Sequence, residues 1–572
     1  MQFSDVIWSD SLASFFSKLI LHKSIDTINS TIRKQCGIID FFDEISWTNF
    51  CEQVEAPNAA EPFRRAYGDF QTNDGLALAV TEILYKAGSN PTFILEPTCG
   101  KGSILRAALK TFSKTVTRAV GIEIYEPYWW HTKFSILHDY LQNRHANPPH
   151  IEIYLADIFK VKFANLAKET IDDSVLLLGN PPWITNAELG TLNSSNLPKK
   201  LNLKREKGLD AMTGKGNFDL GEYILLTVIA PFQRHAGHFA FLVKNAVVKN
   251  LLYSQRNRPL AVNSLTVLNI DAKKEFNASV ASCLFYGKLN AASANQAHEF
   301  DFYSNQRITR FGWSGGKFVR DLDNYEQSLT LDGKSPFTWR QGLKHDCSKV
   351  MEFETANENF VNRLGETFEL EFDLVYPLLK SSDLKDSVVD HCRKYTLVTQ
   401  QKIGQSTNWI SDQLPLTYNY LLRHKTRFNA RKSSIYNGKP AFSIFGIGEY
   451  SFAPYKVAIS GMYKRTLFSL ILPIDGKPAM LDDTCYFIGF QDPQTAKITH
   501  HLLNGKPVQR LLQSIIFMDA KRPITKDILM RVNVEEAYRQ AEKPVEITVE
   551  AWNKYGSELA QTTTTVNQMS LF

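Results

Sequence analysis

The chain has 572 residues, which is too long for one ordinary hydrophobic core, and about two or three domains are expected. Its content of 44% hydrophobic and 22% charged residues is that of a folded protein and excludes a disordered one. The formal net charge of +6 suits a polyanionic partner but is too small to identify one.

The seven cysteines are scattered without C-x-x-C spacing, so neither a zinc site nor a disulfide framework is indicated, and no metal is expected. Free thiols suit a reducing cytoplasm. Residues 1–18 carry Asp5 and Asp10 among their apolar positions, without the pattern of a cleaved leader, and no stretch reaches transmembrane length. We therefore expect a cytoplasmic protein.

Residues 1–60 are predicted to form short amphipathic helices, because Leu12, Phe16 and Leu19 recur at helical spacing. The acidic residues of this segment do not form a nuclease-like cluster followed by lysine. The segment is also short for a nuclease domain. A built-in endonuclease is therefore not expected.

Residues 61–298 alternate apolar strands with helical segments, which predicts a doubly wound α/β sheet. The expected strands cover residues 92–95, 119–122, 151–155, 175–178, 239–243, 265–270 and 281–285. Ligands of such a sheet lie beyond the carboxyl ends of its strands. The residues that follow each strand are therefore candidates for a binding site.

A glycine-rich turn, Glu96-Pro97-Thr98-Cys99-Gly100-Lys101-Gly102, connects the first strand to a helix over residues 104–112. Its glycines allow close approach of a ligand, but its spacing fits neither the dinucleotide fingerprint nor the phosphate loop. The second strand ends in Glu123, and Asp157 follows the third. A single acid at a strand end is usually a helix cap, whereas three in order indicate a site.

The fourth strand ends in Asn180-Pro181-Pro182-Trp183. The prolines fix φ and carry no N–H, so their carbonyl groups can face a ligand from a rigid backbone. The side-chain oxygen of Asn180 and the carbonyl oxygen of Pro181 can each accept one N–H of an exocyclic amine. Asparagine is no general base, so the proton of that amine would leave to water.

These motifs resemble those of class I methyltransferases that use S-adenosylmethionine, and the tetrapeptide is most similar to that of the adenine-N6 DNA methyltransferases. The resemblance implies a Rossmann-like, mixed seven-stranded sheet. It also implies that the glycine loop borders the methionine end of the cofactor, that Glu123 holds the ribose hydroxyls and that Asp157 accepts the adenine amine. The cofactor-binding residues implied are Thr72, Glu96, Pro97, Gly100, Gly102, Glu123 and Asp157.

Residues 68–73, Gly-Asp-Phe-Gln-Thr-Asn, precede a predicted helix over residues 76–86 and resemble the N-terminal cofactor motif of the family. That motif usually has proline after threonine, and Asn73 stands in its place here. The order of this motif, the glycine loop and a final recognition domain matches type II restriction-modification methyltransferases.

The resemblance further implies a target adenine that is flipped out of the duplex and held by stacking. Trp183 offers one ring face, and Phe276 matches the aromatic residue that covers the other. Residues 184–216 are too long for an ordinary loop and are expected to form a lid, and residues 216–220 match a motif near the adenosyl pocket. The catalytic residues implied are Asn180, Pro181, Pro182, Trp183 and Phe276.

Residues 299–555 lack the strand–helix alternation and predict an α+β domain for recognition of double-stranded DNA. Basic and aromatic residues interleave between positions 418 and 465, which suits phosphate contact and base-edge readout, although charge runs are more often solvated faces. They are Tyr420, Arg423, His424, Lys425, Arg427, Arg431, Lys432, Tyr436, Tyr455, Lys456, Tyr463, Lys464 and Arg465.

The sequence therefore predicts a site-specific DNA adenine-N6 methyltransferase, the modification component of a restriction-modification or other defence system whose endonuclease is a separate chain. Relatives with Ser-Pro-Pro methylate cytosine N4 instead. Two alternatives stay open: a protein-glutamine or other amino-group methyltransferase, whose amide nitrogen poses the same chemical problem, and a non-catalytic DNA-binding scaffold.

Residues 556–572 are predicted to be a flexible tail. Its last five residues, from Gln568 to Phe572, read Gln-Met-Ser-Leu-Phe and resemble the peptide with which bacterial proteins bind the replicative sliding clamp. The resemblance implies a tether that raises the local concentration of the enzyme at newly made DNA. A terminus that docks on its own domain is the alternative.

Overall fold

The computed structural model describes residues 9–20, 24–54, 70–143, 147–184, 219–356 and 359–541. The chain forms two compact units, Met1–Phe318 and Val319–Phe572. In the described ranges, every helix is too short or too polar to cross a membrane.

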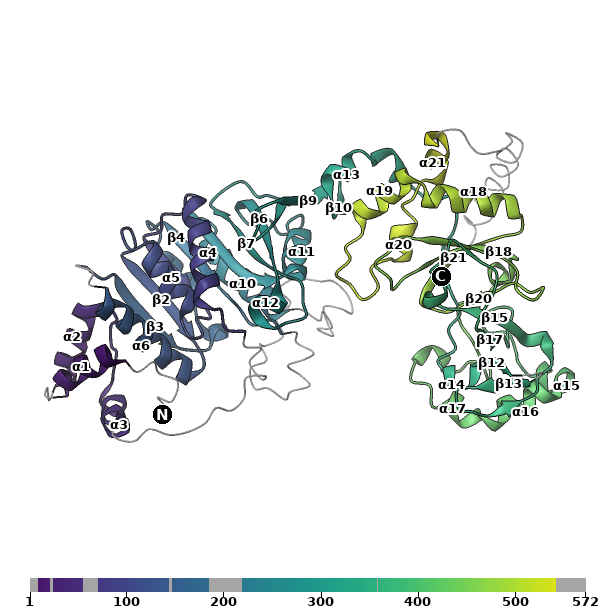
Figure 1. Cartoon of the computed structure of the whole chain (residues 1–572), viewed down its shortest axis with the longest axis horizontal. Coiled ribbons are helices and arrows are strands. Elements are labelled where there is room, and N and C mark those ends of the chain that lie inside the picture. The colour runs from purple at the N-terminus through teal and green to yellow at the C-terminus, as the bar shows by residue number, and fades with distance from the viewer. Residues whose placement is uncertain are drawn as a thin grey trace. The chain divides into compact units, whose positions relative to one another are not determined.

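A ten-stranded mixed sheet forms the centre of the first unit (Figure 1), in the order β10-β9-β8-β6-β7-β5-β4-β1-β2-β3. All seven strands predicted from the sequence are present. They are β1 (Phe93–Glu96), β2 (Arg118–Glu123), β3 (His150–Leu155), β4 (Val175–Gly179), β5 (Gly237–Lys244), β6 (Val262–Ile270) and β7 (Ser282–Leu289). Strand β7 runs antiparallel to β5 and β6, and β1 to β5 pair in parallel. The Rossmann-like, mixed seven-stranded core is therefore confirmed.

Three further strands extend this sheet beyond β6: β8 (Gln296–Asp301), β9 (Arg307–Ser314) and β10 (Lys317–Val319). Strand β8 pairs in parallel with β6 and antiparallel with β9. The hairpin covers the backbone edge of β6, which would otherwise be left unpaired. The first unit therefore continues to Phe318, and the boundary expected between residues 298 and 299 falls inside β8.

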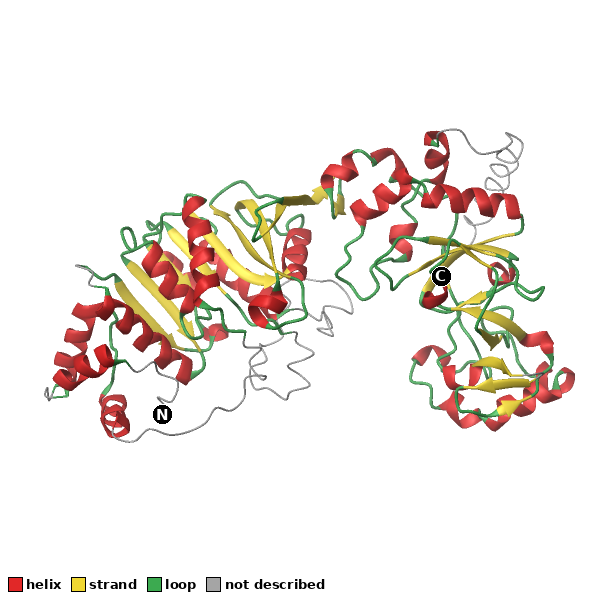
Figure 2. Ribbon diagram, in the orientation of Figure 1, coloured by secondary structure: helices red, strands yellow, loops and turns green. Residues whose placement is uncertain are grey.

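Helices cover both faces of the sheet (Figure 2). Neighbouring residues of a strand point to opposite faces. Ile94 of β1 belongs to the core built with α4 (Asp74–Lys86), α5 (Ser103–Thr111) and α6 (Glu126–Gln142). Phe93 instead stacks on Phe232 of α10 (Leu220–Phe232), beside which α7 (Phe163–Glu169) and α11 (Asn245–Ser254) pack. Burial on both faces explains the continuous apolar run of β4.

Three N-terminal helices, α1 (Asp10–Leu19), α2 (Ile25–Cys36) and α3 (Glu44–Val54), belong to the first unit. Phe16 of α1 and Phe50 of α3 contact Phe134 of α6, with ring centroids 5.6 and 5.5 Å apart. Lys133 of α6 is buried, and its Nζ donates to the carbonyl oxygens of Asp40 and Phe41. Burial lowers the pKa of Lys133 to about 7. The N-terminal helices are thus packed firmly onto α6.

The second unit is an α+β structure with a five-stranded sheet, β11-β21-β18-β19-β16, and a six-stranded sheet, β14-β13-β12-β17-β15-β20. The strands are β11 (Arg340–Gln341), β12 (Glu352–Ala356), β13 (Asn359–Asn362), β14 (Thr367–Phe368), β15 (Val375–Leu379), β16 (Val388–Val389), β17 (Lys394–Leu397), β18 (Tyr455–Ser460), β19 (Phe468–Ile471), β20 (Met480–Leu481) and β21 (Cys485–Phe490). The helices are α13 (Leu322–Glu326), α14 (Ser348–Met351), α15 (Trp409–Gln413), α16 (Pro415–Arg423), α17 (Lys425–Asn429), α18 (Pro493–Asn504), α19 (Lys506–Ile515), α20 (Lys526–Leu529) and α21 (Val534–Gln540). The predicted α+β class is confirmed.

The basic and aromatic stretch between residues 418 and 465 is divided between the interior and the surface of this unit. Tyr420 is 2% exposed, and its hydroxyl donates to a backbone carbonyl oxygen at 2.8 Å. His424 is 5% exposed and pairs with Glu366, and Lys456 is 1% exposed and donates to a backbone carbonyl oxygen. The expectation of DNA contact is wrong for these three residues, because their side chains are buried inside the unit. The exposed members are Arg423, Lys425, Arg427, Lys432, Tyr463, Lys464 and Arg465.

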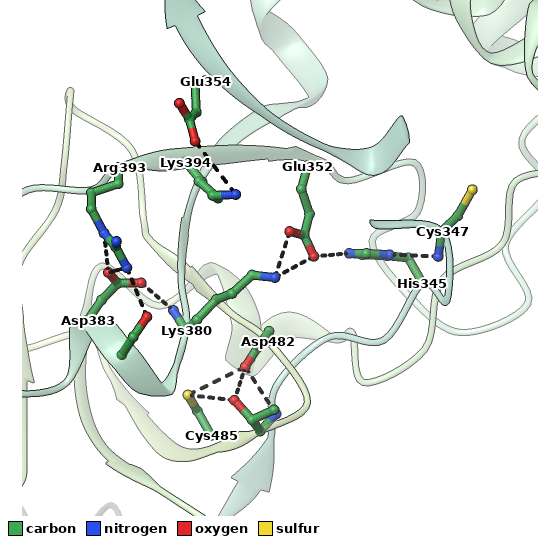
Figure 3. A network of polar contacts seen from close by, with 12 residues as sticks. His345, Cys347, Glu352, Glu354, Lys380, Asp383, Arg393, Lys394, Asp482 and Cys485 are labelled. Carbon is green, nitrogen blue, oxygen red and sulfur yellow. Dashed lines mark hydrogen bonds and ion pairs between the residues drawn. The ribbon is translucent and has the colours of Figure 1, made fainter. Parts of the chain in front are cut away.

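A network of polar contacts lies in the second unit (Figure 3). Nζ of Lys380 is 2.6 Å from both carboxylate oxygens of Glu352, and Nε2 of His345 is 3.5 Å from one of them. The backbone N–H of Cys347 donates to Nδ1 of His345, so the other ring nitrogen is the one left to face Glu352. Burial alone would raise the pKa of Glu352, but the hydrogen bonds from His345 and Lys380 lower it to about 2. Glu352 is therefore ionised at neutral pH and holds Lys380 in place.

Candidate active site

The carboxyl ends of four neighbouring parallel strands, β3, β2, β1 and β4, meet at one edge of the first sheet. Glu96 and Glu123 end β1 and β2, Asp157 follows β3, and Asn180 follows β4. Residues far apart in the sequence are thus brought into one row, as expected for the ligand-binding edge of such a sheet.

The glycine loop between β1 and α5 has two residues in the left-handed region, Gly100 with φ +53° and Gly102 with φ +79°. A Cβ on Gly102 would lie 2.7 Å from Cγ2 of Thr132, and one on Gly100 would lie 2.8 Å from Oε1 of Gln71. The hydroxyl of Thr132 donates to the carbonyl oxygen of Gly100, and the backbone N–H of Lys101 donates to Oε1 of Gln71. Backbone conformation favours glycine at both positions, and close packing against Thr132 adds a steric requirement at Gly102.

Glu96 is 1% exposed, and among the described residues its Oε2 has no hydrogen-bond partner. Burial, with a smaller contribution from the negative charge of Glu123, raises the pKa of Glu96 well above its ordinary value. A Cβ on Gly179 would lie 3.5 Å from Cγ of Glu96, so this carboxyl group lies beside the start of the Asn-Pro-Pro-Trp segment. An unsatisfied buried carboxyl group is unfavourable until a donor or a cation meets it.

The other two acids are engaged with the backbone. Glu123 accepts the N–H groups of Gly100, Ile124 and Tyr125 at 2.8, 2.9 and 2.7 Å. A carboxylate offers about four acceptor sites, so a diol that engaged both oxygens would replace at least one of these bonds. Asp157 caps the short helix η2 (Ile158–Lys160) by accepting the N–H of Phe159, which is the ordinary role of an acid at this place.

The amide of Asn180 is fixed by the segment that precedes α4. Its Nδ2 donates to the carbonyl oxygen of Phe70 at 2.7 Å and to Oγ1 of Thr72 at 3.2 Å. Two acceptors on one side set the orientation of the amide, because only its nitrogen can donate. Its Oδ1 is buried and has no hydrogen-bond partner within the described ranges. Thr72 is 8% exposed, so this anchor is itself held in place.

Trp183, Phe276 and Phe70 form an aromatic cluster next to this amide. Trp183 is 6% exposed, and its Nε1–H donates to the carbonyl oxygen of Leu242. Its ring lies 4.8 Å from that of Phe276, edge to face, and 5.2 Å from that of Phe70. Phe276 is half-buried and ends the short helix α12 (Ala272–Phe276). The two rings expected to enclose a base are therefore in direct contact.

Asn73, which stands where the family has proline, has two roles that sequence reasoning missed. Its Oδ1 accepts the N–H of Leu76 and so caps α4, and its Nδ2 donates to Oε2 of Glu275 at 3.0 Å. Asparagine directly before a predicted helix was the available signal for the cap. The role of Glu275 as a partner carried no signal, since it depends on a contact between distant parts of the chain.

The start of α10 lies beside the residues that follow the tetrapeptide. Asp219 caps this helix and pairs with Nζ of Lys244, and the N–H of Leu220 donates to the carbonyl oxygen of Ile184. Tyr223 of α10 contacts Phe159, with ring centroids 5.3 Å apart, a pairing that no sequence pattern indicates. The lid was expected over residues 184–216. From position 185 onward, this segment lies outside the described residues.

In the described part of the chain, no group of three or more His, Cys, Asp or Glu side chains could hold a metal ion.

No family model matches the chain. The type II methyltransferase M.NspV of Nostoc sp. (strain ATCC 29411 / PCC 7524) is 37% identical over 477 residues, which cover 83% of this chain and 98% of that protein.

Among solved structures, the type IIL restriction-modification enzyme MmeI in complex with DNA matches 94% of this chain and 79% of its own, with 12% identity and a TM-score of 0.44. The methyltransferase subunit of a type I restriction-modification system from Streptococcus thermophilus matches 42% of this chain and 50% of its own, with 16% identity and a TM-score of 0.30. The sequence relative decides the family, because it matches over almost its whole length. The chain belongs to the type II methyltransferases.

Proposed function

We propose that this methyltransferase transfers a methyl group from S-adenosylmethionine to N6 of an adenine that has left the duplex of DNA. The observation that carries the proposal is the amide of Asn180. Its nitrogen is held by Phe70 and Thr72, whereas its buried oxygen meets no donor among the described residues. Such an oxygen is an acceptor prepared for an N–H group of the substrate.

An exocyclic amine has two N–H groups, and its lone pair is delocalised into the ring. In the proposed reaction Oδ1 of Asn180 accepts one N–H and the carbonyl oxygen of Pro181 accepts the other. The lone pair is thereby directed away from both acceptors and towards the methyl donor. Neither acceptor is a base at neutral pH, so the proton leaves to water.

The residues at the strand ends fit S-adenosylmethionine by their chemistry. The cofactor carries an ammonium group, a ribose diol and an adenine amine, all of which are donors, and a sulfonium cation that supplies the methyl group. Glu96, Glu123 and Asp157 are acceptors in one row, and Oε2 of Glu96 meets no donor elsewhere in the described ranges. We assign Glu96 to the methionine end, Glu123 to the ribose and Asp157 to the adenine, with Pro97, Gly100 and Gly102 bordering the ligand and Thr72 beside it.

A flipped base can stack between Trp183 and Phe276 only if the planes of these two side-chain rings are about 7 Å apart, twice the contact distance of roughly 3.5 Å. Their centroids are 4.8 Å apart, so one ring has to yield. Trp183 is anchored by a hydrogen bond to β5, whereas Phe276 is half-buried and lies at the end of one short helix. We propose that Trp183 is the fixed ring and that the side chain of Phe276 rotates to admit the adenine.

We assign DNA recognition to the second unit. A polar cavity of about 710 Å³ in this unit is lined by five lysine and arginine side chains and by four acidic ones, Asp346, Glu352, Asp482 and Asp483. The lysines and arginines are the candidates for contact with DNA. They are Lys344, Lys380, Arg427, Arg431 and Lys432. Arg427 and Lys432 are exposed and suit contact with phosphates. We further propose that the chain is the modification component of a restriction-modification or defence system, with the endonuclease on another chain.

The test of this function is the product. Purified chain is incubated with tritium-labelled S-adenosylmethionine and mixed-sequence plasmid DNA, which is digested to nucleosides and separated. We expect labelled N6-methyladenine. Labelled N4-methylcytosine would contradict the choice of base, label in protein instead of DNA would favour the protein-glutamine alternative, and no transfer to either would favour a non-catalytic scaffold.

The C-terminal peptide from Gln568 to Phe572 lies outside the described residues, and its proposed partner is the replicative sliding clamp. We expect the full chain to bind purified clamp in a calorimetric titration, and a chain that ends at residue 567 not to bind. Equal heats from the two chains would contradict the proposal, and transfer to DNA by the shortened chain is the control for its integrity.

A further inference from the structure

The side chain of Glu275 ties the helix that carries Phe276 to the segment that orients Asn180. Helix α12 is a single short element, capped at its start by Asp271 and ended by Asn277 in the left-handed conformation. Oε2 of Glu275 accepts the amide N–H of Asn73 at 3.0 Å. Oε1 of Glu275 accepts the hydroxyl of Tyr303 at 2.9 Å. Both oxygens are thus engaged by donors from outside α12.

These contacts form one network. Nζ of Lys274 lies 3.6 Å from Oε1 of Glu275 and 4.4 Å from the ring centroid of Tyr303. Burial alone would raise the pKa of Glu275, but the hydrogen bonds from Asn73 and Tyr303 lower it overall. Glu275 therefore stays ionised at neutral pH, and hydrogen bonds to an ionised acceptor are about twice as strong as neutral ones.

The network touches the reaction site on two sides. Asn73 directly follows Thr72, whose hydroxyl accepts one N–H of the Asn180 amide. Phe276 directly follows Glu275, and its ring contacts Trp183 and Phe70. The segment that aims the acceptor of the methylated nitrogen and the helix that presents the movable ring are therefore joined by the bond between Asn73 and Glu275.

We propose that Glu275 is a positioning residue that keeps the backbone of α12 in place while the side chain of Phe276 rotates, so that this ring presses on the flipped adenine. The inference rests on the proposed function and adds a residue to it. A ring can hold a base against a fixed partner only if its own backbone resists displacement. The two bonds of Glu275, together with the caps of α12, supply that resistance.

The test uses the full chain and two forms of one DNA duplex that contains its target sequence. Unmodified DNA gives kcat, and DNA with the fluorescent analogue 2-aminopurine in place of the target adenine reports flipping. In the parent chain, flipping of the analogue raises its fluorescence. Glu275→Ala is expected to reduce this rise and to lower kcat by roughly 10- to 100-fold, as expected for a misplaced reacting group. The KM for S-adenosylmethionine should not change, because Glu275 has no direct hydrogen bond to a residue assigned to the cofactor. Its bond is to Asn73, which only neighbours Thr72 in the sequence.

Three further variants keep the fold and divide the network. Asn73→Ser retains a good helix cap but removes the amide donor, and Tyr303→Phe removes the hydroxyl donor. Both should reduce kcat and fluorescence in the same direction as Glu275→Ala, by less. Glu275→Gln keeps one acceptor oxygen and should recover part of the loss. Glu82→Ala, which removes an exposed acid of α4, is the matched control and should behave as the parent chain.

The two levels of the proposal fail in different ways. If the parent chain makes no N6-methyladenine, the proposed function is wrong. If the parent chain makes it, and Glu275→Ala shows the kcat and fluorescence of Glu82→Ala, the role of Glu275 is wrong while the function stands. A loss of thermal stability in Glu275→Ala without a change in kcat or fluorescence would likewise contradict the positioning role.

Discussion

Replacing Asn180 by alanine is expected to lower methyl transfer by roughly 10²- to 10³-fold, the size seen when one preorganised hydrogen-bonding group that serves a transition state is removed. The Oδ1 atom is the acceptor proposed for the methylated amine, and it is buried without a donor among the described residues. Affinity for S-adenosylmethionine should stay that of the parent chain, since Asn180 is proposed to contact the base and the strand-end acids are proposed to hold the cofactor. Single-turnover transfer of labelled methyl and calorimetric titration of the cofactor measure the two quantities.

Two further variants separate the acceptor from its support. Asn180→Asp keeps acceptor oxygens but loses both N–H groups, so the bond to the carbonyl oxygen of Phe70 is lost and the hydroxyl of Thr72 would have to become the donor. Turnover should therefore fall towards that of the alanine variant. Thr72→Val removes one of these two partners and should give an intermediate loss. Asn143→Ala, an exposed asparagine at the end of α6, is the matched control. Near-parent turnover in Asn180→Ala would show that the amide does not activate the nitrogen.

The strands of the first unit were predictable because each is a short apolar run bounded by turn residues. Val175 to Gly179 is buried at every position, and its sequence signal is correspondingly continuous. The row of Glu96, Glu123, Asp157 and Asn180 followed from the same argument, since parallel strands of such a sheet end at one edge. Pattern reasoning therefore succeeds where one strand, taken with its following turn, determines the answer.

Pattern reasoning is insufficient where the position of a residue depends on its tertiary surroundings. His424 belongs to a basic run, yet it is buried beside Glu366 from another part of the chain. Lys456 belongs to the same run, and it is buried because its strand, β18, is the middle strand of the five-stranded sheet. Strand β8 looks like the short strands of the second unit, and only its pairing with β6 assigns it to the first. Asn73 departs from the family motif in sequence, yet its side chain both caps α4 and reaches Glu275. Charge and propensity are local, whereas these outcomes are set by tertiary contacts.

The glycine loop supports the second large effect, a loss of cofactor affinity in Gly102→Ala. Gly102 has φ +79°, so alanine costs about 1–2 kcal/mol from the left-handed backbone alone. Its Cβ would also lie 2.7 Å from Cγ2 of Thr132, and the hydroxyl of that residue holds the carbonyl group of Gly100. Thr132 and the loop must therefore separate, and the loop backbone proposed to border the cofactor shifts with them.

Gly88→Ala isolates this steric effect from the backbone cost. Gly88 has φ +86°, and a Cβ there would meet no atom within 4 Å, so both variants carry a similar conformational penalty. We expect both to lower the thermal unfolding temperature, but only Gly102→Ala to weaken binding of S-adenosylmethionine, by about 10- to 100-fold or roughly 1.4–2.8 kcal/mol. The double variant Gly102→Ala/Thr132→Ala removes the two nearest atoms and should regain part of the affinity. Equal affinities of Gly88→Ala and Gly102→Ala in calorimetric titration would mean that the cofactor does not lie against this loop.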